Sequence, residues 1–105
     1  MTAPVILPAA AWGEGGNQSA LNVSAAAVIV PYTIRLARIV VLVSPGSGAA
    51  TFNDCATTGA AAAGNVIINI PTMTAVGTVY DLNWPCLVGL TCSAAGGGAF
   101  SVSFG

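Results

Sequence analysis

Very few side chains of this sequence could carry out chemistry, and they are scattered along the chain. The charged residues among its 105 positions are Glu14, Arg35, Arg38, Asp54 and Asp81, and the sequence has neither lysine nor histidine. A serine or cysteine nucleophile would have only a carboxylate as its base, and no triad-like spacing is present. Asp54 and Asp81 could form a glycosidase pair, but turn and ion-pair roles are commoner in so small a chain. We therefore expect no catalytic residues and a protein that is not an enzyme.

The residues also give little support for a metal or cofactor site. Cys55, Cys86 and Cys92 form no Cys-x-x-Cys motif with further ligands beside it. The segments "GAAAAG" and "PGSG" lack the Lys-Ser/Thr pair of a phosphate-binding loop. Three cysteines cannot all pair, so we expect buried, reduced thiols, as suits assembly in a cytoplasm, while a Cys86 to Cys92 bridge stays open. No metal and no cofactor is predicted.

The composition excludes further classes of partner. Hydrophobic residues make up 55% of the chain and charged residues 5%, against about a quarter charged in an average soluble domain. A net charge of −1 does not favour nucleic acid or an acidic membrane. The long uncharged run 55–80 is interrupted by Gly, Asn and Pro, so no membrane-spanning helix is predicted. The N-terminal segment has no basic region and carries two early prolines, which indicates an extended arm rather than a signal peptide.

The elements that would position these residues are predicted from a two-residue alternation of apolar and polar side chains. In "AFSVSFG", "NVIINIP" and "LVGLTCSA" the expected inward residues are Phe100, Val102, Phe104, Val66, Ile68, Ile70, Val88, Leu90 and Cys92. The last of these segments precedes "AAGGG", which predicts a hairpin, and "ATTGAAAAG" predicts a turn or one helical turn. Further strands are expected in "ALNVSAAAVIV", "YTIRLARIVVLV", "TFNDC" and "VYDLNW".

Short strands with Gly and Pro between them predict an all-β fold. We expect one domain, a β-sandwich or jelly roll of about seven to eight short strands. Its expected limits are residues 19–105, preceded by an extended N-terminal arm over residues 1–18. A two-domain arrangement is excluded by the length of the chain.

The two arginines leave alternatives open. Arg35 and Arg38 are three positions apart, so strict alternation would place them on opposite faces of a sheet. Either a bulge intervenes and both arginines are solvated or loosely paired, or they form a buried or interfacial pair with Asp54 or Asp81.

The aromatic residues also have two interpretations. Tyr80, Leu82 and Trp84 fall on one strand face and are expected to be core residues. Alternatively, Trp12, Tyr32, Tyr80 and Trp84 could form a stacking platform for sugars. Trp12 lies among small residues of the arm, where an aromatic side chain favours an anchor inserted into a neighbouring subunit.

The shortage of charge predicts that partners bury much of the surface. The arm and the two arginines are the expected interface, which comprises Pro4, Val5, Ile6, Leu7, Trp12, Arg35 and Arg38. The segments "TFNDCATTGAAAAGNVIINIP", "YDLNWPCLVGLTCSA" and "AFSVSFG" resemble, in order and spacing, a group of small tailed-bacteriophage virion proteins. This resemblance covers about residues 50–105.

The resemblance implies a β-sandwich that coats the virion as a capsid decoration, or cement, protein. It also implies the major capsid protein as the partner, a homotrimer of the chain itself, and assembly in the cytoplasm of a host bacterium before the protein occupies the capsid surface. A head-fibre base or tail protein, and a glycan-binding module in host recognition, remain the alternatives.

Overall fold

The computed structural model describes residues 17–105, which fold into eight β-strands and two short 3₁₀ helices. No helix in this range is long and apolar enough to cross a membrane. The elements are β1 (Gln18–Val23), β2 (Ala27–Val30), β3 (Ile34–Val43), β4 (Ala50–Asn53), η2 (Thr58–Ala60), η3 (Ala63–Asn65), β5 (Val66–Ile70), β6 (Val79–Cys86), β7 (Leu90–Ala94) and β8 (Ala99–Phe104).

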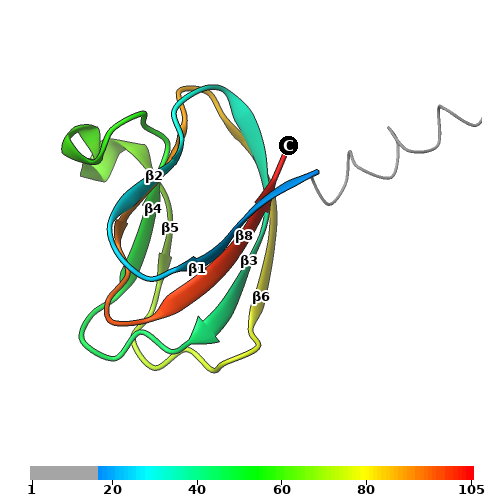
Figure 1. Cartoon of the computed structure of the whole chain (residues 1–105). Helices are drawn as coiled ribbons and strands as arrows, with labels where there is room; N and C mark the ends of the chain where they lie inside the picture. The colour runs from blue at the N-terminus through cyan, green and yellow to red at the C-terminus, as the bar shows by residue number, and fades with distance from the viewer. Residues whose placement is uncertain (1–16) are drawn as a thin grey trace, which may run out of the picture.

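The strands form two antiparallel sheets packed face to face (Figure 1). The first sheet has the order β1-β8-β3-β6, and the second has the order β2-β7-β4-β5. The first strand thus pairs with the last, the second with the seventh, the third with the sixth, and the fourth with the fifth. An antiparallel ribbon of four strand pairs that is rolled up into two sheets in this way is the jelly roll. The expected all-β sandwich is therefore confirmed.

Alternating apolar residues from both sheets fill the space between them. Phe52 of β4 and Phe100 of β8 meet at its centre, with ring centroids 5.6 Å apart in an edge-to-face arrangement. The expected inward residues Phe100, Val102 and Phe104 are all buried, as are Leu90, Cys92 and Ile70. Val66 and Ile68 are half-buried, and Val88 is exposed because it precedes β7, in the loop after β6. The alternation of apolar and polar residues therefore predicted the buried face of β8 correctly, and the buried residues of β5 and β7 in part.

A bulge at Ala37 settles the direction of the two arginines. The pairing of β3 with β8 passes from Leu36 opposite Phe104 to Arg38 opposite Ser103, which leaves Ala37 as an extra residue. Leu36 and Ala37 are both buried, whereas Arg35 and Arg38 are both exposed. An extra residue reverses the side-chain alternation, so both arginines lie on the outer face of the first sheet. The bulge interpretation is confirmed.

Two predictions about the strands are wrong. No hairpin joins "LVGLTCSA" to a neighbour, because β7 belongs to the second sheet while β6 and β8 both belong to the first. The segment after β7 crosses between the sheets, with Gly96 and Gly97 at positive φ and the backbone of Gly96 against that of Gly48. The run "ALNVSAAAVIV" is also two strands rather than one, since the chain leaves the first sheet after β1 and enters the second at β2.

The segment between β4 and β5 covers one end of the outer face of the second sheet. It contains η2 and η3, in agreement with the expected turn, and it is drawn in green at the top left of Figure 1. Beneath it lie Asn53 and Thr91, which are paired across β4 and β7 and are both buried. No described segment covers the outer face of the first sheet in the same way (Figure 1). The two faces of the sandwich are therefore unlike.

Candidate functional site

The outer face of the first sheet holds both described residues of the expected interface. Arg38 donates from Nε to Oδ1 of Asp81 on the neighbouring strand β6, and both side chains remain largely open to solvent. Arg35 donates from Nη1 to the backbone oxygen of Asn83 at 3.1 Å. Two arginines against one aspartate leave a local excess of positive charge. The other expected interface residues, Pro4, Val5, Ile6, Leu7 and Trp12, lie outside the described residues.

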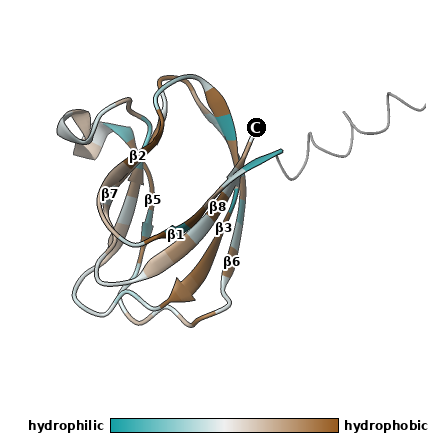
Figure 2. Cartoon of the chain, viewed as in Figure 1, coloured by the Kyte–Doolittle hydropathy of each residue, from teal (hydrophilic) through white to brown (hydrophobic). Residues whose placement is uncertain are grey.

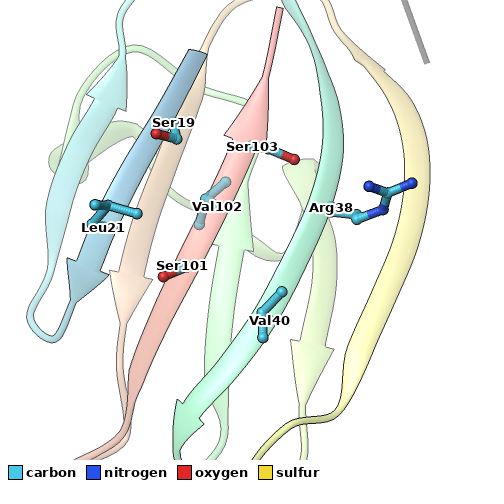
Figure 3. A pocket seen from close by; sticks show the side chains of 7 residues that line it. All are labelled: Ser19, Leu21, Arg38, Val40, Ser101, Val102 and Ser103. Atoms are coloured by element: carbon cyan, nitrogen blue, oxygen red, sulfur yellow. The ribbon is translucent and has the colours of Figure 1, made fainter. Parts of the chain in front are cut away.

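A shallow trough of about 220 Å³ runs over β8 on this face. Figure 3 shows Ser101 and Ser103 of β8 with Leu21 of β1 on one side and Val40 and Arg38 of β3 on the other. The floor is low because the serines are small, and the flanks are higher because leucine, valine and arginine are large. We call this feature the trough; it is lined by Ser19, Leu21, Arg38, Val40, Ser101, Val102 and Ser103.

Two details distinguish the trough from an ordinary solvent-facing sheet surface. Leu21 is 74% exposed, which is unusual for a leucine on a flat sheet face. Among the described residues, Ser103 has the one buried side-chain polar atom that lacks a hydrogen-bond partner. Buried hydroxyls are normally satisfied, so Ser103 is an exception to this rule on the strand that underlies the trough.

Asp54 organises one end of the sandwich. Its carboxylate accepts hydrogen bonds from the backbone N–H groups of Leu87, Val88 and Gly89 at 2.9, 2.8 and 3.1 Å. Burial raises the pKa of this carboxyl, but the hydrogen bonds from Val88, Leu87 and Gly89 prevail and hold the pKa below its ordinary value. The carboxylate therefore fixes the loop between β6 and β7, 33 residues away in sequence.

The residues beside Asp54 tie down the segment with the two 3₁₀ helices. Asn53 donates from Nδ2 to Oδ1 of Asn65 at 2.8 Å and accepts from the Ser93 hydroxyl at 2.7 Å. The Thr91 hydroxyl donates to the backbone oxygen of Cys55 at 2.9 Å. Each buried polar group in this network has a partner, so it stabilises one loop conformation. The "NDC" part of the motif is accordingly a scaffold for loops.

The three cysteines are free and buried. Burial raises the pKa of Cys86 to about 11, with a further contribution from the negative charge of Asp54, and burial also raises the pKa of Cys92. Thiols with raised pKa hold little thiolate at neutral pH and react slowly. The prediction of buried cysteines without a disulfide is confirmed.

The prediction that Trp84 is a core residue is wrong. Tyr80 and Leu82 pack against the core as expected, but the side chain of Trp84 is 51% exposed. The pairing of β6 with β3 shifts between Asp81 and Trp84, and Asn83 there has a positive φ of 46°. This irregularity, on an edge strand, leaves Trp84 at the rim of the sheet. The alternative, a sugar platform, loses Tyr80, which packs against the core, while Trp12 lies outside the described residues.

Large apolar side chains are exposed at both ends of the sandwich. One group lies where β3 ends and β6 begins, and the hydrophobic colour of β3 continues to this end in Figure 2. The other lies at the end that Asp54 organises, where Thr33 donates to the backbone oxygen of Leu87 at 2.8 Å. The first group contains Leu42, Val43, Met73, Val76 and Val79; the second contains Tyr32, Leu87 and Val88.

The described residues contain no cluster of three or more His, Cys, Asp or Glu side chains that could hold a metal ion. The suggested carboxylate pair is divided between two other tasks, since Asp54 binds a loop and Asp81 binds Arg38. What the arrangement offers chemically is contact surface. It is largely apolar, with one ion pair and one unsatisfied hydroxyl.

No protein family, no curated protein and no solved structure matches this chain. The role of each residue is therefore inferred from the chain's own geometry.

Sequence reasoning missed the trough as a whole and the contacts of Asp54. The sequence predicts Asp54 as a partner for arginine or as half of a carboxylate pair, whereas Asp54 binds backbone groups of a distant loop. The trough depends on which strands flank β8, and strand order cannot be obtained from alternation alone. The serine alternation in "AFSVSFG" did predict its floor, because it placed Ser101 and Ser103 on the outer face.

Proposed function

We propose that this protein is a non-enzymatic structural component of a bacteriophage virion, a capsid decoration protein that binds the outside of the capsid lattice and links neighbouring subunits. Its partners would be the major capsid protein and copies of itself in a homotrimer. Its mechanism would be passive: apolar and main-chain contacts add buried area between subunits, and the added area strengthens the shell.

The character of the surface carries this proposal. Residues 17–105 contain only four charged side chains, Arg35, Arg38, Asp54 and Asp81. Eleven large hydrophobic side chains are exposed in the same range, grouped mainly at the ends of the sandwich. A soluble monomer usually covers itself with interspersed charges, and large exposed apolar patches mark interaction sites. An extended interface with protein partners accounts for both features.

The virion part of the proposal takes its biological setting from the resemblance to small phage virion proteins that the sequence of residues 50–105 led us to expect. The fold adds an argument by analogy. The jelly roll is used by viral capsid proteins, although lectins and cupins use it as well, so the fold is an argument by analogy.

Binding to capsids that lack decoration proteins tests the proposal. Purified protein would be mixed with expanded, undecorated capsids of the phage that encodes it, and sedimentation would measure the bound copies. We expect saturable binding in a fixed ratio to the capsid protein, together with capsids that rupture at a higher temperature. Binding that does not saturate, or none at all, would contradict the proposal.

A glycan-binding module is the second candidate, and the exposure of Trp84 favours it. Trp84 is 51% exposed and Tyr32 is 57% exposed, so aromatic faces are available for stacking on sugars. Titration of the protein with host surface oligosaccharides, followed by tryptophan fluorescence, distinguishes the two candidates. A saturable change that disappears in Trp84→Ala would favour glycan binding, whereas an unchanged spectrum would favour the structural role.

A further inference from the structure

We propose that the trough on the outer face of the first sheet receives the apolar segment Pro4–Trp12 of a second copy of this chain. The inference rests on the proposed function, since it names the place where the linking arm binds. The occupant is an extended peptide, and the bound surface is the row of serines on β8 between Leu21 and Val40.

The shape and polarity of the trough suit an extended apolar peptide. A hollow of about 220 Å³ can hold a large side chain, since a cavity of about 150 Å³ holds benzene. Val5, Ile6, Leu7 and Trp12 supply bulky side chains in a segment otherwise composed of Ala and Pro.

Charge also favours this occupant. The outer face carries Arg35 and Arg38 against the single carboxylate of Asp81, and Arg35 is bonded only to a backbone oxygen. Glu14 is the only charged side chain among residues 1–16. An acidic group two residues after Trp12 would therefore be attracted to the face that carries Arg38, which lines the trough, and Arg35.

The register favours a second copy over the chain's own arm. The N–H of Asn17 donates to the oxygen of Phe104, so the chain enters the sheet at the end of the trough near Ser19 and Ser103. A reversal within Gly13–Gly16 would lay residues 9–11, all alanine, beside Leu21 and carry Pro4–Leu7 beyond the end of β1. An arm from another copy has no such constraint, and 16 residues can extend over about 50 Å.

Disulfide trapping tests the proposal in the full chain. The double variant Ile6→Cys/Ser101→Cys places one thiol on the segment and one on the floor of the trough. Under mild oxidation we expect dimers and larger oligomers on a non-reducing gel, formed roughly tenfold faster than in Ile6→Cys/Thr72→Cys. Thr72 is exposed in the loop between β5 and β6, at the end of the sandwich where β3 ends, so that variant is the matched control.

The other outcomes are informative as well. A cross-linked monomer would show that the segment lies on its own sheet, and cross-linking no faster than in the control would show that the trough is not its site; either overturns the proposal. Ser101→Trp should fill the trough and reduce the native mass, while Thr72→Trp should not. If cross-linking fails but the protein still binds capsids, only the arm proposal is overturned. If the arms cross-link to the trough but the protein does not bind capsids, only the proposed function is overturned.

Discussion

At the scale of single residues, one carboxylate determines the shape of an entire loop. Asp54 receives three backbone N–H groups from residues 87–89, and this loop presents Leu87 and Val88 to solvent. Without Asp54 these N–H groups would have no charged acceptor, and the exposed side chains of Leu87 and Val88 would lose their fixed position. Asp54 thus determines where these two apolar side chains lie, because it binds the backbone that carries them.

Asp54→Asn should lower the free energy of unfolding by about 1–3 kcal/mol, because hydrogen bonds to a charged acceptor are replaced by weaker ones. Urea denaturation followed by circular dichroism gives the value from a shift in midpoint at constant slope. Asp81→Asn is the control, since its exposed ion pair should contribute at most about 1 kcal/mol. Equal losses in the two variants would contradict the role assigned to Asp54.

The same carboxylate should make stability depend on pH at the acidic end. The pKa of Asp54 is lower in the folded protein than its ordinary value of 3.8, so the unfolded chain binds the proton more readily. The contribution of Asp54 is therefore complete above about pH 4 and is lost as the pH falls through the folded pKa. Thermal unfolding between pH 2 and 6 should show this decline in the native protein and a weaker decline in Asp54→Asn.

Trp84 and Phe52 should differ clearly when each is truncated to alanine. Phe52 is fully buried against Phe100, so Phe52→Ala should cost about 3–5 kcal/mol. Trp84 is half exposed, so Trp84→Ala should cost about 1–2 kcal/mol. Chemical denaturation of both variants measures the difference in the free energy of unfolding. A loss from Trp84→Ala as large as that from Phe52→Ala would show that Trp84 is a core residue after all.

At the scale of elements, the existence and facing of strands were more predictable than their partners. The pattern of Phe100, Val102 and Phe104 was sufficient to place β8, because a half-buried strand imposes a period of two. The bulge at Ala37 was foreseen only as one of two explanations for the spacing of the arginines. Trp84 was misplaced because an irregular pairing on an edge strand leaves no mark in the period.

The crossing from β7 to β8 was mistaken for a hairpin because a glycine cluster is common to both. The crossing differs from a hairpin in the segment that its glycines contact. An added Cβ on Gly96 would lie 2.1 Å from the backbone oxygen of Gly48, in the loop after β3. That contact joins segments far apart in sequence, so local turn chemistry could not reveal it.

Gly96→Ala should therefore destabilise the fold by roughly 2 kcal/mol or more, from both the positive φ of 60° and the clash with Gly48. Gly59→Ala is the control, because nothing lies within 4 Å of the added Cβ there. Thermal unfolding of the two variants measures the contrast. A Gly96→Ala protein as stable as Gly59→Ala would mean that the crossing can move without cost.

At the scale of the whole molecule, the uncharged surface makes a prediction about assembly. Contacts that bury apolar area are weakened little by salt, whereas contacts between charges are screened. Native mass, measured by light scattering after size exclusion in reducing buffer, should therefore exceed that of a monomer and should persist at high sodium chloride. Dissociation on adding salt would indicate that the arginines dominate the interface.

Removal of residues 1–12 should leave the sandwich folded and weaken its assembly. The core consists of residues from β2 to β8, so the circular dichroism spectrum and the unfolding midpoint should change little. The native mass of the truncated protein should fall toward that of a monomer. An unchanged native mass would show that the described surface is sufficient for association.

The nested pairing of the strands also has a consequence for the order in which the protein can fold. β4 and β5 are the closest partners along the chain, and each successive pair closes a longer loop, ending with β1 and β8. Local pairs form fastest, and distant pairs must wait for the chain between them to be ordered. During synthesis the first sheet lacks its β8 strand until residues 99–104 have left the ribosome. The trough, on which the arm of a neighbouring copy is proposed to bind, is therefore completed last. A partly synthesised chain offers no binding site to the arm of another copy.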